Sequence, residues 1–194
     1  TAAAESAAVW LNERLRGRDG RWRTSFRAGH VSGTATLEDY AYLAAAFLDL
    51  HAVSTNARWM DEAIETVSCI DRHFRDVERG GYFLVADDHE KLLARVKNPT
   101  DNATPSGNGV AAQVLVRLFE LTNEPVYRER AGELFRMFHP PMDMAPLQVE
   151  SLLRAFDSAL AADLLPRETE GHVRQGPLTA ELDIGDRRLT AGQR

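Results

Sequence analysis

The chain of 194 residues is long enough for one domain with a hydrophobic core. Apolar residues make up 44% and charged residues 27% of it, which is typical of a globular protein and excludes a disordered chain. Because the net charge is −6 and no basic stripe is present, nucleic acid and membrane surfaces are poor candidate partners. We recognise no signal peptide and no membrane-spanning run, and Cys69 is the single cysteine, so we expect a cytoplasmic protein without a disulfide.

Six segments have helical periodicity, and they alternate in character. The segments 2–16, 57–76 and 125–138 carry their apolar residues on one face. The segments 36–53 and 105–121 are apolar on most sides, apart from Gln113 and Arg117, and 146–162 is grouped with them. A helix with one apolar stripe lies at the surface, whereas a helix that is apolar all round is covered on both sides. The alternation therefore predicts an all-α fold with two layers, built from three helical hairpins.

An internal repeat and two longer connections complete this reading of the chain. Thr55-Asn56-Ala57-Arg58-Trp59 matches Thr122-Asn123-Glu124-Pro125-Val126-Tyr127, and both mark a short turn from an inner to an outer helix. Residues 82–85 and 92–96 alternate around a polar turn, which predicts a small β-hairpin. Residues 164–194 lack periodicity. We therefore expect a helical-hairpin domain over 1–163 and a loosely ordered tail over 164–194.

Several motifs in this order resemble one known family. They are Leu37-Glu38-Asp39-Tyr40-Ala41, Arg58-Trp59, Gly80-Gly81-Tyr82-Phe83, Asp88-His89-Glu90 with Arg95 and Lys97, and Thr104-Pro105-Ser106-Gly107-Asn108. Together they resemble the C-terminal region of the thioredoxin-domain-containing, spermatogenesis-associated protein 20-like family. The resemblance covers about residues 5–162 and does not include the thioredoxin part. It implies a partial (α/α)6 toroid of the six-hairpin glycosidase type, related to N-acylglucosamine 2-epimerases, with a small β-hairpin insertion.

In such a toroid the outer-to-inner connections and the N-termini of the inner helices meet at one end. Pockets form there, and carboxylates, amides and an aromatic ring suit the hydroxyls and the apolar face of a sugar. We expect no cofactor and no metal. The expected ligand-binding residues at this end are Trp22, Tyr40, Asp101, Asn102, Ser106, Asn108 and Glu150.

Glu38 and Asp39 are the candidate catalytic carboxylates. Glycoside hydrolysis needs two carboxyl groups on opposite sides of the scissile bond. Neighbouring helical residues point about 100° apart, so each would need a partner from another hairpin, such as Asp101 or Glu150. The alternative is structural, since Thr36 and Asp39 are spaced like a capping box and Glu38 favours a helix N-terminus.

Two other motifs have a functional and a structural reading. Ser106 and Asn108 could bind ligand hydroxyls, or Thr104 could cap a helix whose glycines allow close packing. Asp87-Asp88-His89-Glu90 has the composition of a metal site, but a solvated turn is favoured at a hairpin tip.

The leading functional hypothesis is a protein that binds a sugar or sugar-like metabolite, with or without catalysis. Epimerase chemistry is not supported, because His30 and His89 are the only histidines expected near the pocket end, and neither lies on an inner helix. The alternative is a non-catalytic helical module that binds a protein partner. Because three hairpins leave open edges, we also expect an exposed patch and a homo-oligomer, with the patch formed by Phe47, Leu48, Leu153 and Phe156.

Overall fold

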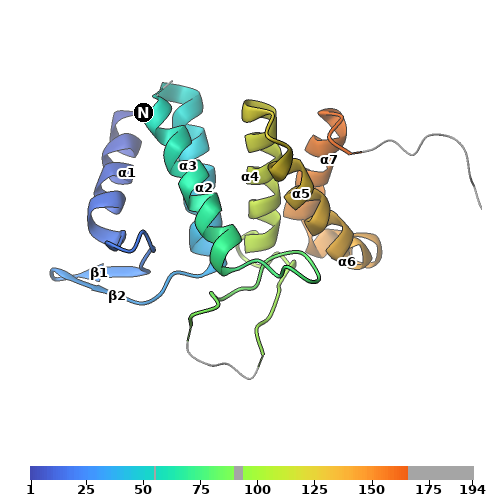
Figure 1. Cartoon of the computed structure of the whole chain (residues 1–194), viewed down its shortest axis with the longest axis horizontal. Coiled ribbons are helices and arrows are strands. Elements are labelled where there is room, and N and C mark those ends of the chain that lie inside the picture. The colour runs from blue at the N-terminus through green and yellow to red at the C-terminus, as the bar shows by residue number, and fades with distance from the viewer. Residues whose placement is uncertain (55, 90–93, 166–194) are drawn as a thin grey trace, which may run out of the picture.

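The computed structural model describes residues 1–54, 56–89 and 94–165. Figure 1 shows its helices standing side by side, with most of the longer loops at one end. The elements are α1 (Ala2–Leu15), β1 (Ser25–Arg27), β2 (His30–Ser32), α2 (Leu37–Ser54), α3 (Ala57–His73), α4 (Gly107–Thr122), α5 (Pro125–Met137), α6 (His139–Met144), a 3₁₀ turn η1 (Pro146–Gln148) and α7 (Glu150–Ala161).

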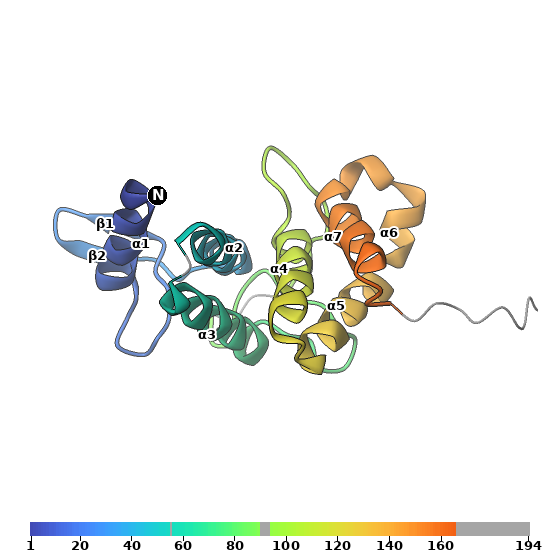
Figure 2. The ribbon, with the colours of Figure 1, turned by 90° about the horizontal axis from the view of Figure 1, so that it is seen from above.

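The helices form the two layers that the alternation of apolar character predicts. Figure 2 shows α2, α4 and α7 in one row, with α3 and α5 in a second row beside them. The helix α4 packs against α2, α5 and α7, and α2 packs against α3. The predicted all-α fold of inner and outer helices is therefore confirmed.

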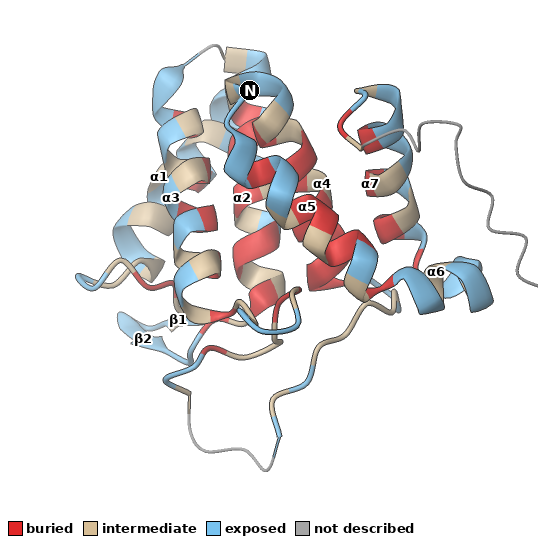
Figure 3. Cartoon of the chain, turned by 45° about the vertical axis from the view of Figure 1, so that its right-hand side comes forward, coloured by how far each residue is buried: buried red, intermediate tan, exposed pale blue. Residues whose placement is uncertain are grey.

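The core lies between the two rows. The first six residues of α4 are all buried, and so are Phe47 and Leu48 of α2. Figure 3 shows buried residues of α2 and α4 in red. Phe47 stacks on Trp59 of α3 with ring centroids 5.9 Å apart. The expectation that Phe47 and Leu48 form an exposed edge is wrong, because both side chains are packed in the hydrophobic core, while Leu153 and Phe156 are half-buried. Self-association stays a prediction, which light scattering at micromolar concentration tests.

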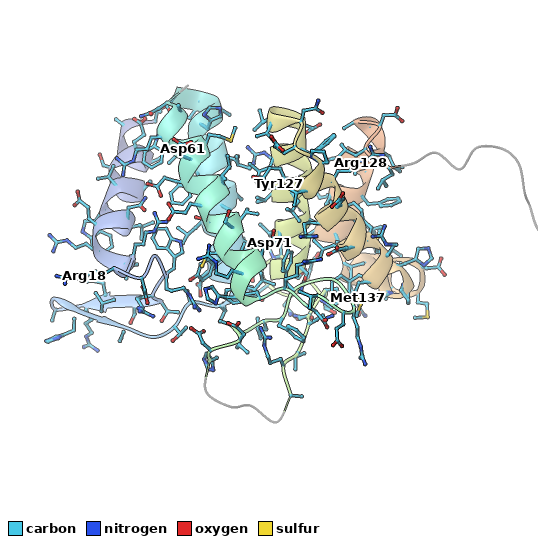
Figure 4. All side chains as sticks on the ribbon, in the orientation of Figure 1. Arg18, Asp61, Asp71, Tyr127, Arg128 and Met137 are labelled. Carbon is cyan, nitrogen blue, oxygen red and sulfur yellow. The ribbon has the colours of Figure 1, made fainter. Side chains whose placement is uncertain are left out.

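The outer helices are joined to each other by charged side chains. Figure 4 views the molecule from this layer and labels Asp71 on α3 and Tyr127 on α5. The guanidinium of Arg75, just after α3, binds both carboxylate oxygens of Glu133 on α5 at 3.1 and 2.8 Å. The Asp71 carboxylate accepts a hydrogen bond of 2.7 Å from the hydroxyl of Tyr82. These contacts attach the connection after α3 to the outer layer.

The β-hairpin lies elsewhere than the alternation at 82–96 predicts. It is formed by β1 and β2, which pair antiparallel with Phe26 opposite Val31. Its two loop residues, Ala28 and Gly29, both have positive φ, which suits the twist of a two-residue hairpin. No strand is assigned to the described residues of 82–96, where Leu84 donates to the carbonyl of Val96. The backbone of 83–87 instead bonds to the end of α3 and the residue after it, which replaces the expected ladder.

The C-terminal part also departs from expectation. The predicted helix 146–162 begins at Glu150, and the short helices α6 and η1 precede it, each with a proline in its first turn. Of the predicted tail 164–194, residues 166–194 lie outside the described part of the structure, while Leu164 is buried in the core. No helix of the described residues is long and apolar enough to cross a bilayer.

Candidate functional site

The inner helices α2, α4 and α7 all begin at the end of the molecule where the long connections gather (Figure 1). At the start of α2, the Asp39 carboxylate accepts hydrogen bonds from the backbone N–H and the hydroxyl of Thr36, at 2.8 and 3.1 Å. This is the capping arrangement that the Thr36–Asp39 spacing predicts. Glu38 is half-buried where α2 meets α4. The two helices are close at this point, since a Cβ added to Gly107 would lie 3.0 Å from Glu38 Cγ.

Trp22 and Tyr40, two expected ligand contacts, lie in the core. Their exposed fractions are 1% and 0%. The Tyr40 hydroxyl accepts hydrogen bonds from the backbone N–H of Trp22 at 3.0 Å and from Arg21 Nε at 3.1 Å. Burial raises the pKa of Tyr40, while these donors oppose the rise. The two residues therefore fasten the first connection to α2 from inside the protein.

Asn108 makes the equivalent attachment for the second connection. Its amide accepts from the backbone N–H of Tyr82 and donates to the carbonyl of the same residue, both at 3.0 Å. A further hydrogen bond of 3.2 Å reaches the carbonyl of Asn98. Asn108 is 1% exposed, so it holds the loop against α4 from within the core. A backbone N–H and C=O that would otherwise be buried without partners are both satisfied.

Asp101 joins the first turns of α4 and α7. Its carboxylate accepts from the backbone N–H groups of Ser106 and Ser151, both at 2.7 Å, and from the Ser151 hydroxyl at 2.5 Å. Burial opposes ionisation of this carboxyl group, but the hydrogen bonds from Ser151 and Ser106 outweigh it and lower its pKa. Ser106 is itself the N-cap of α4, with its hydroxyl accepting from Gly109 N–H at 3.1 Å. These groups stabilise two helix N-termini.

We call the hydrogen-bonded group of Asp101, Ser106 and Ser151 the hub. A hollow of about 350 Å³ opens beside it, and we call this the loop-end hollow. Three of the expected ligand contacts line it, namely Asp101, Asn102 and Glu150. Its apolar lining includes Ala45 of α2 and Val110 of α4. Trp22, Tyr40, Ser106, Asn108, Glu38 and Asp39 are not among its lining residues. The polar residues that line it are Tyr42, Asp101, Asn102, Gln113, Glu150, Ser151 and Arg154, with Thr104 from the loop.

Sequence reasoning missed Tyr42 and Arg154 and noted Gln113 only as an interruption. Tyr42 donates its hydroxyl to the carbonyl of Pro105 at 2.9 Å, and Gln113 donates its amide to the carbonyl of Ser151 at 2.8 Å. Arg154 is exposed and makes no ion pair with any residue that the structure describes. A polar residue inside an otherwise apolar helix is the signal that could have identified Gln113.

A second polar cluster lies at the end of α3. His73, Asp87 and Asp88 place one potential ligand atom each within 4.8 Å of one another, the one such group among residues 1–54, 56–89 and 94–165. Asp88 is paired bidentately with Arg21 at 2.8 and 3.1 Å, and this cation lowers its pKa. Asp87 contacts His73 Nδ1 at 3.0 Å. Each carboxylate already has a partner, and the pair of Arg21 and Asp88 connects the first loop to the second. Glu90, the last residue of the motif, lies outside the described residues.

The second connection is also fastened by Arg95 and Lys97. Lys97 Nζ lies 2.7 Å from the Asp76 carboxylate in a largely buried salt bridge, in which the two side chains are 9% and 14% exposed. Arg95 donates to the carbonyls of Val85 and His73. Both cations also lie over the ring of Phe83.

Part of the chain is similar in sequence to known proteins. The chain is 32% identical over 123 residues to spermatogenesis-associated protein 20 from Rattus norvegicus and from Homo sapiens, and 27% identical over 124 residues to an uncharacterized protein from Caenorhabditis elegans. These matches cover 63–64% of this chain but only 16–17% of the relatives. No family model matches the chain.

A solved structure has the same arrangement of helices. Cellobiose 2-epimerase from Spirochaeta thermophila aligns over 75% of this chain and 38% of its own length, with a TM-score of 0.58 and 22% sequence identity. This likeness shows the fold. The chain is thus similar in sequence to a segment of spermatogenesis-associated protein 20, and its helices have the arrangement of part of an (α/α)6 toroid.

Proposed function

We propose that this chain binds a sugar or a sugar-like metabolite in the loop-end hollow. One observation carries the proposal: side chains from all three inner helices and one loop meet in a single hollow of sugar size, with both polar and apolar walls. The carboxylate of Glu150, the amide of Gln113 and the guanidinium of Arg154 offer acceptors and donors for hydroxyl groups. Ala45 and Val110 offer an apolar wall for a ring face.

The fold of the neighbour adds support. A protein named for its action on cellobiose has the same arrangement of helices. Shared fold does not transfer a reaction, so the proposal rests on the hollow and takes from the neighbour only the class of ligand to try.

Binding without turnover fits the carboxylates best. Asp39 is engaged in capping, and Glu38 packs where α2 meets α4. Asp101 accepts three hydrogen bonds from protein groups. A general acid needs a carboxyl group whose pKa is raised, whereas the pKa of Asp101 is lowered by its partners. Glu150 alone is an exposed carboxylate in the hollow, and glycoside hydrolysis needs two.

A thermal-shift experiment with a panel of mono- and disaccharides, cellobiose included, tests the proposal. We expect at least one sugar to raise the melting temperature of the wild type, since a ligand that binds only the folded state stabilises it. Arg154→Ala and Glu150→Gln should weaken this shift, while Asp157→Asn, an exposed change on the same helix outside the hollow, should retain it. A folded wild type that no saccharide stabilises would overturn the proposal.

The alternative, a module that binds a protein partner, has one observation in its favour. The rings of Trp10 in α1 and Phe26 in β1 form an edge-to-face pair with centroids 5.4 Å apart. Trp10 is 42% exposed, and Val31, which lies opposite Phe26 in the hairpin, is 45% exposed. Exposed aromatic pairs are common anchors of protein interfaces. A stoichiometric partner that is retained by the wild type and lost with Phe26→Ala would favour this function.

A further inference from the structure

Two more hollows lie along the inner helices, and each shares lining residues with the one before it. A hollow of about 280 Å³ between α4 and α7 shares Gln113 and Arg154 with the loop-end hollow. A third, of about 360 Å³, lies between α2 and α4 and shares Arg117 and Glu120 with the second. We call the three together the furrow. It runs along the inner layer from the loop end toward His51 near the end of α2.

The helix α4 provides the floor of the furrow through one face. Val110, Gln113, Arg117 and Glu120 follow each other at intervals of three or four residues, so they lie in a row along the helix. Ten residues of α-helix rise about 15 Å. A row of this length is longer than one sugar ring and accommodates several linked rings.

The furrow carries charged side chains of both signs. Glu150 and Arg154 lie at the loop end, and Arg117 and Glu120 lie at the far end. Arg117 is itself paired with Asp49 of α2 at 2.8 Å. A strongly charged polymer of either sign would meet repulsion along part of the furrow. A neutral chain with many hydroxyls can instead donate to the carboxylates and accept from the guanidinium groups.

We propose that the furrow binds a neutral oligosaccharide chain, with one end in the loop-end hollow and the rest over Gln113, Arg117 and Glu120. This inference rests on the proposed function, since it assigns the size and charge of the same ligand. Each further ring would add contacts along α4 without any change in the loop-end hollow. Affinity should therefore increase with chain length until the furrow is filled.

Isothermal titration with matched pairs of sugars tests the inference: glucose and cellotetraose, glucose and maltotetraose, mannose and mannotetraose, and N-acetylglucosamine and chitotetraose. We expect one tetrasaccharide to bind at least about tenfold more tightly than its monomer. The Arg117→Ala variant should lower the ratio of tetrasaccharide to monosaccharide affinity toward one. Asp157→Asn, outside the furrow, should preserve both affinities, and melting temperatures verify that each variant is folded.

The outcomes separate the two proposals. If monomer and tetramer bind with equal affinity, the extended furrow is wrong and the sugar site in the loop-end hollow stands. If a tetramer binds more tightly but Arg117→Ala leaves the ratio unchanged, the chain takes another path and the inference is overturned. If no saccharide binds the folded wild type, the proposed function itself fails.

Discussion

The carboxylate of Asp101 and the hydroxyl of Ser151 are 2.5 Å apart, although fifty residues separate them in the chain. The same carboxylate also accepts from the backbone of Ser106 at the start of α4 and of Ser151 at the start of α7. One side chain thus sets the spacing of two inner helices whose residues line the loop-end hollow. An anionic group at two helix N-termini is favoured by both helix dipoles.

Asp101→Asn should therefore destabilise the protein. The variant loses the charge and one acceptor oxygen, so at least one buried donor of Ser106 or Ser151 is left without its partner. We expect a loss of about 2 kcal/mol in the free energy of unfolding, measured by urea denaturation. Asp157→Asn on the exposed side of α7 is the matched control. A loss no larger than that of the control would show that the hub is dispensable.

Gly109→Ala should separate α4 from α7. An added Cβ would lie 2.8 Å from Ser151 Cβ and would overlap the Ser151 hydroxyl that bonds to Asp101. Overpacking of this kind costs roughly 1–3 kcal/mol. Gly132→Ala in α5 is the control, because its Cβ would meet only the flexible end of Arg136 and alanine favours the helix. The free energy of unfolding, measured by urea denaturation, should thus fall for Gly109→Ala and rise for Gly132→Ala. Equal losses of stability in the two variants would contradict this packing.

The layers could be predicted from the sequence because they depend on local patterns. A run such as Leu43 to Leu48 is apolar on most sides whatever its neighbours are, and the Thr36–Asp39 cap closes within four residues. The β-hairpin was misplaced because Ala28 at φ 49 is not a typical hairpin residue, whereas the alternation at 82–96 has the pattern of a strand. The described residues of 82–96 do not form a strand, because the backbone of 83–87 bonds instead to the end of α3 and the residue after it.

The site residues could be predicted only in part, because a sequence does not show where a side chain points. Asp101, Asn102 and Glu150 line the hollow at the loop end, and their contact with a ligand stays a prediction. Trp22 and Tyr40 belong to segments that reach the same end of the molecule, but their side chains are buried in the core. Arg154 gave no signal, since an exposed arginine is ordinary on an amphipathic helix, and only the neighbouring α4 makes it part of a hollow.

Asp76 should contribute to acid sensitivity. Its hydrogen bond with Lys97 lowers its pKa to about 2, below the value of about 3.9 for an unfolded chain. A depressed pKa stabilises the folded state above the unfolded value, and this contribution is lost as pH falls from about 4 through about 2. Asp76→Asn should therefore be less stable than the wild type at pH 6, with a smaller further loss on acidification. Urea denaturation at several pH values measures this, with exposed Asp61→Asn as the control; parallel curves for wild type and Asp76→Asn would refute the role.

Asn108→Asp replaces an amide donor by a carboxylate in the core. At neutral pH the carboxylate would face the carbonyls of Tyr82 and Asn98, to which the amide now donates, and it would lose its solvation. We expect a loss of roughly 3 kcal/mol at pH 7, because a buried polar group is left unpaired beside like partial charges. Burial raises the pKa of such a carboxyl group above its unfolded value, so protonation restores a donor and the deficit should shrink as pH falls toward 5. Urea denaturation at pH 7 and pH 5 measures both effects, with Asn102→Asp on the exposed loop as the control. A deficit that stays constant between these two pH values would show that the amide does not hold the second connection through its donor.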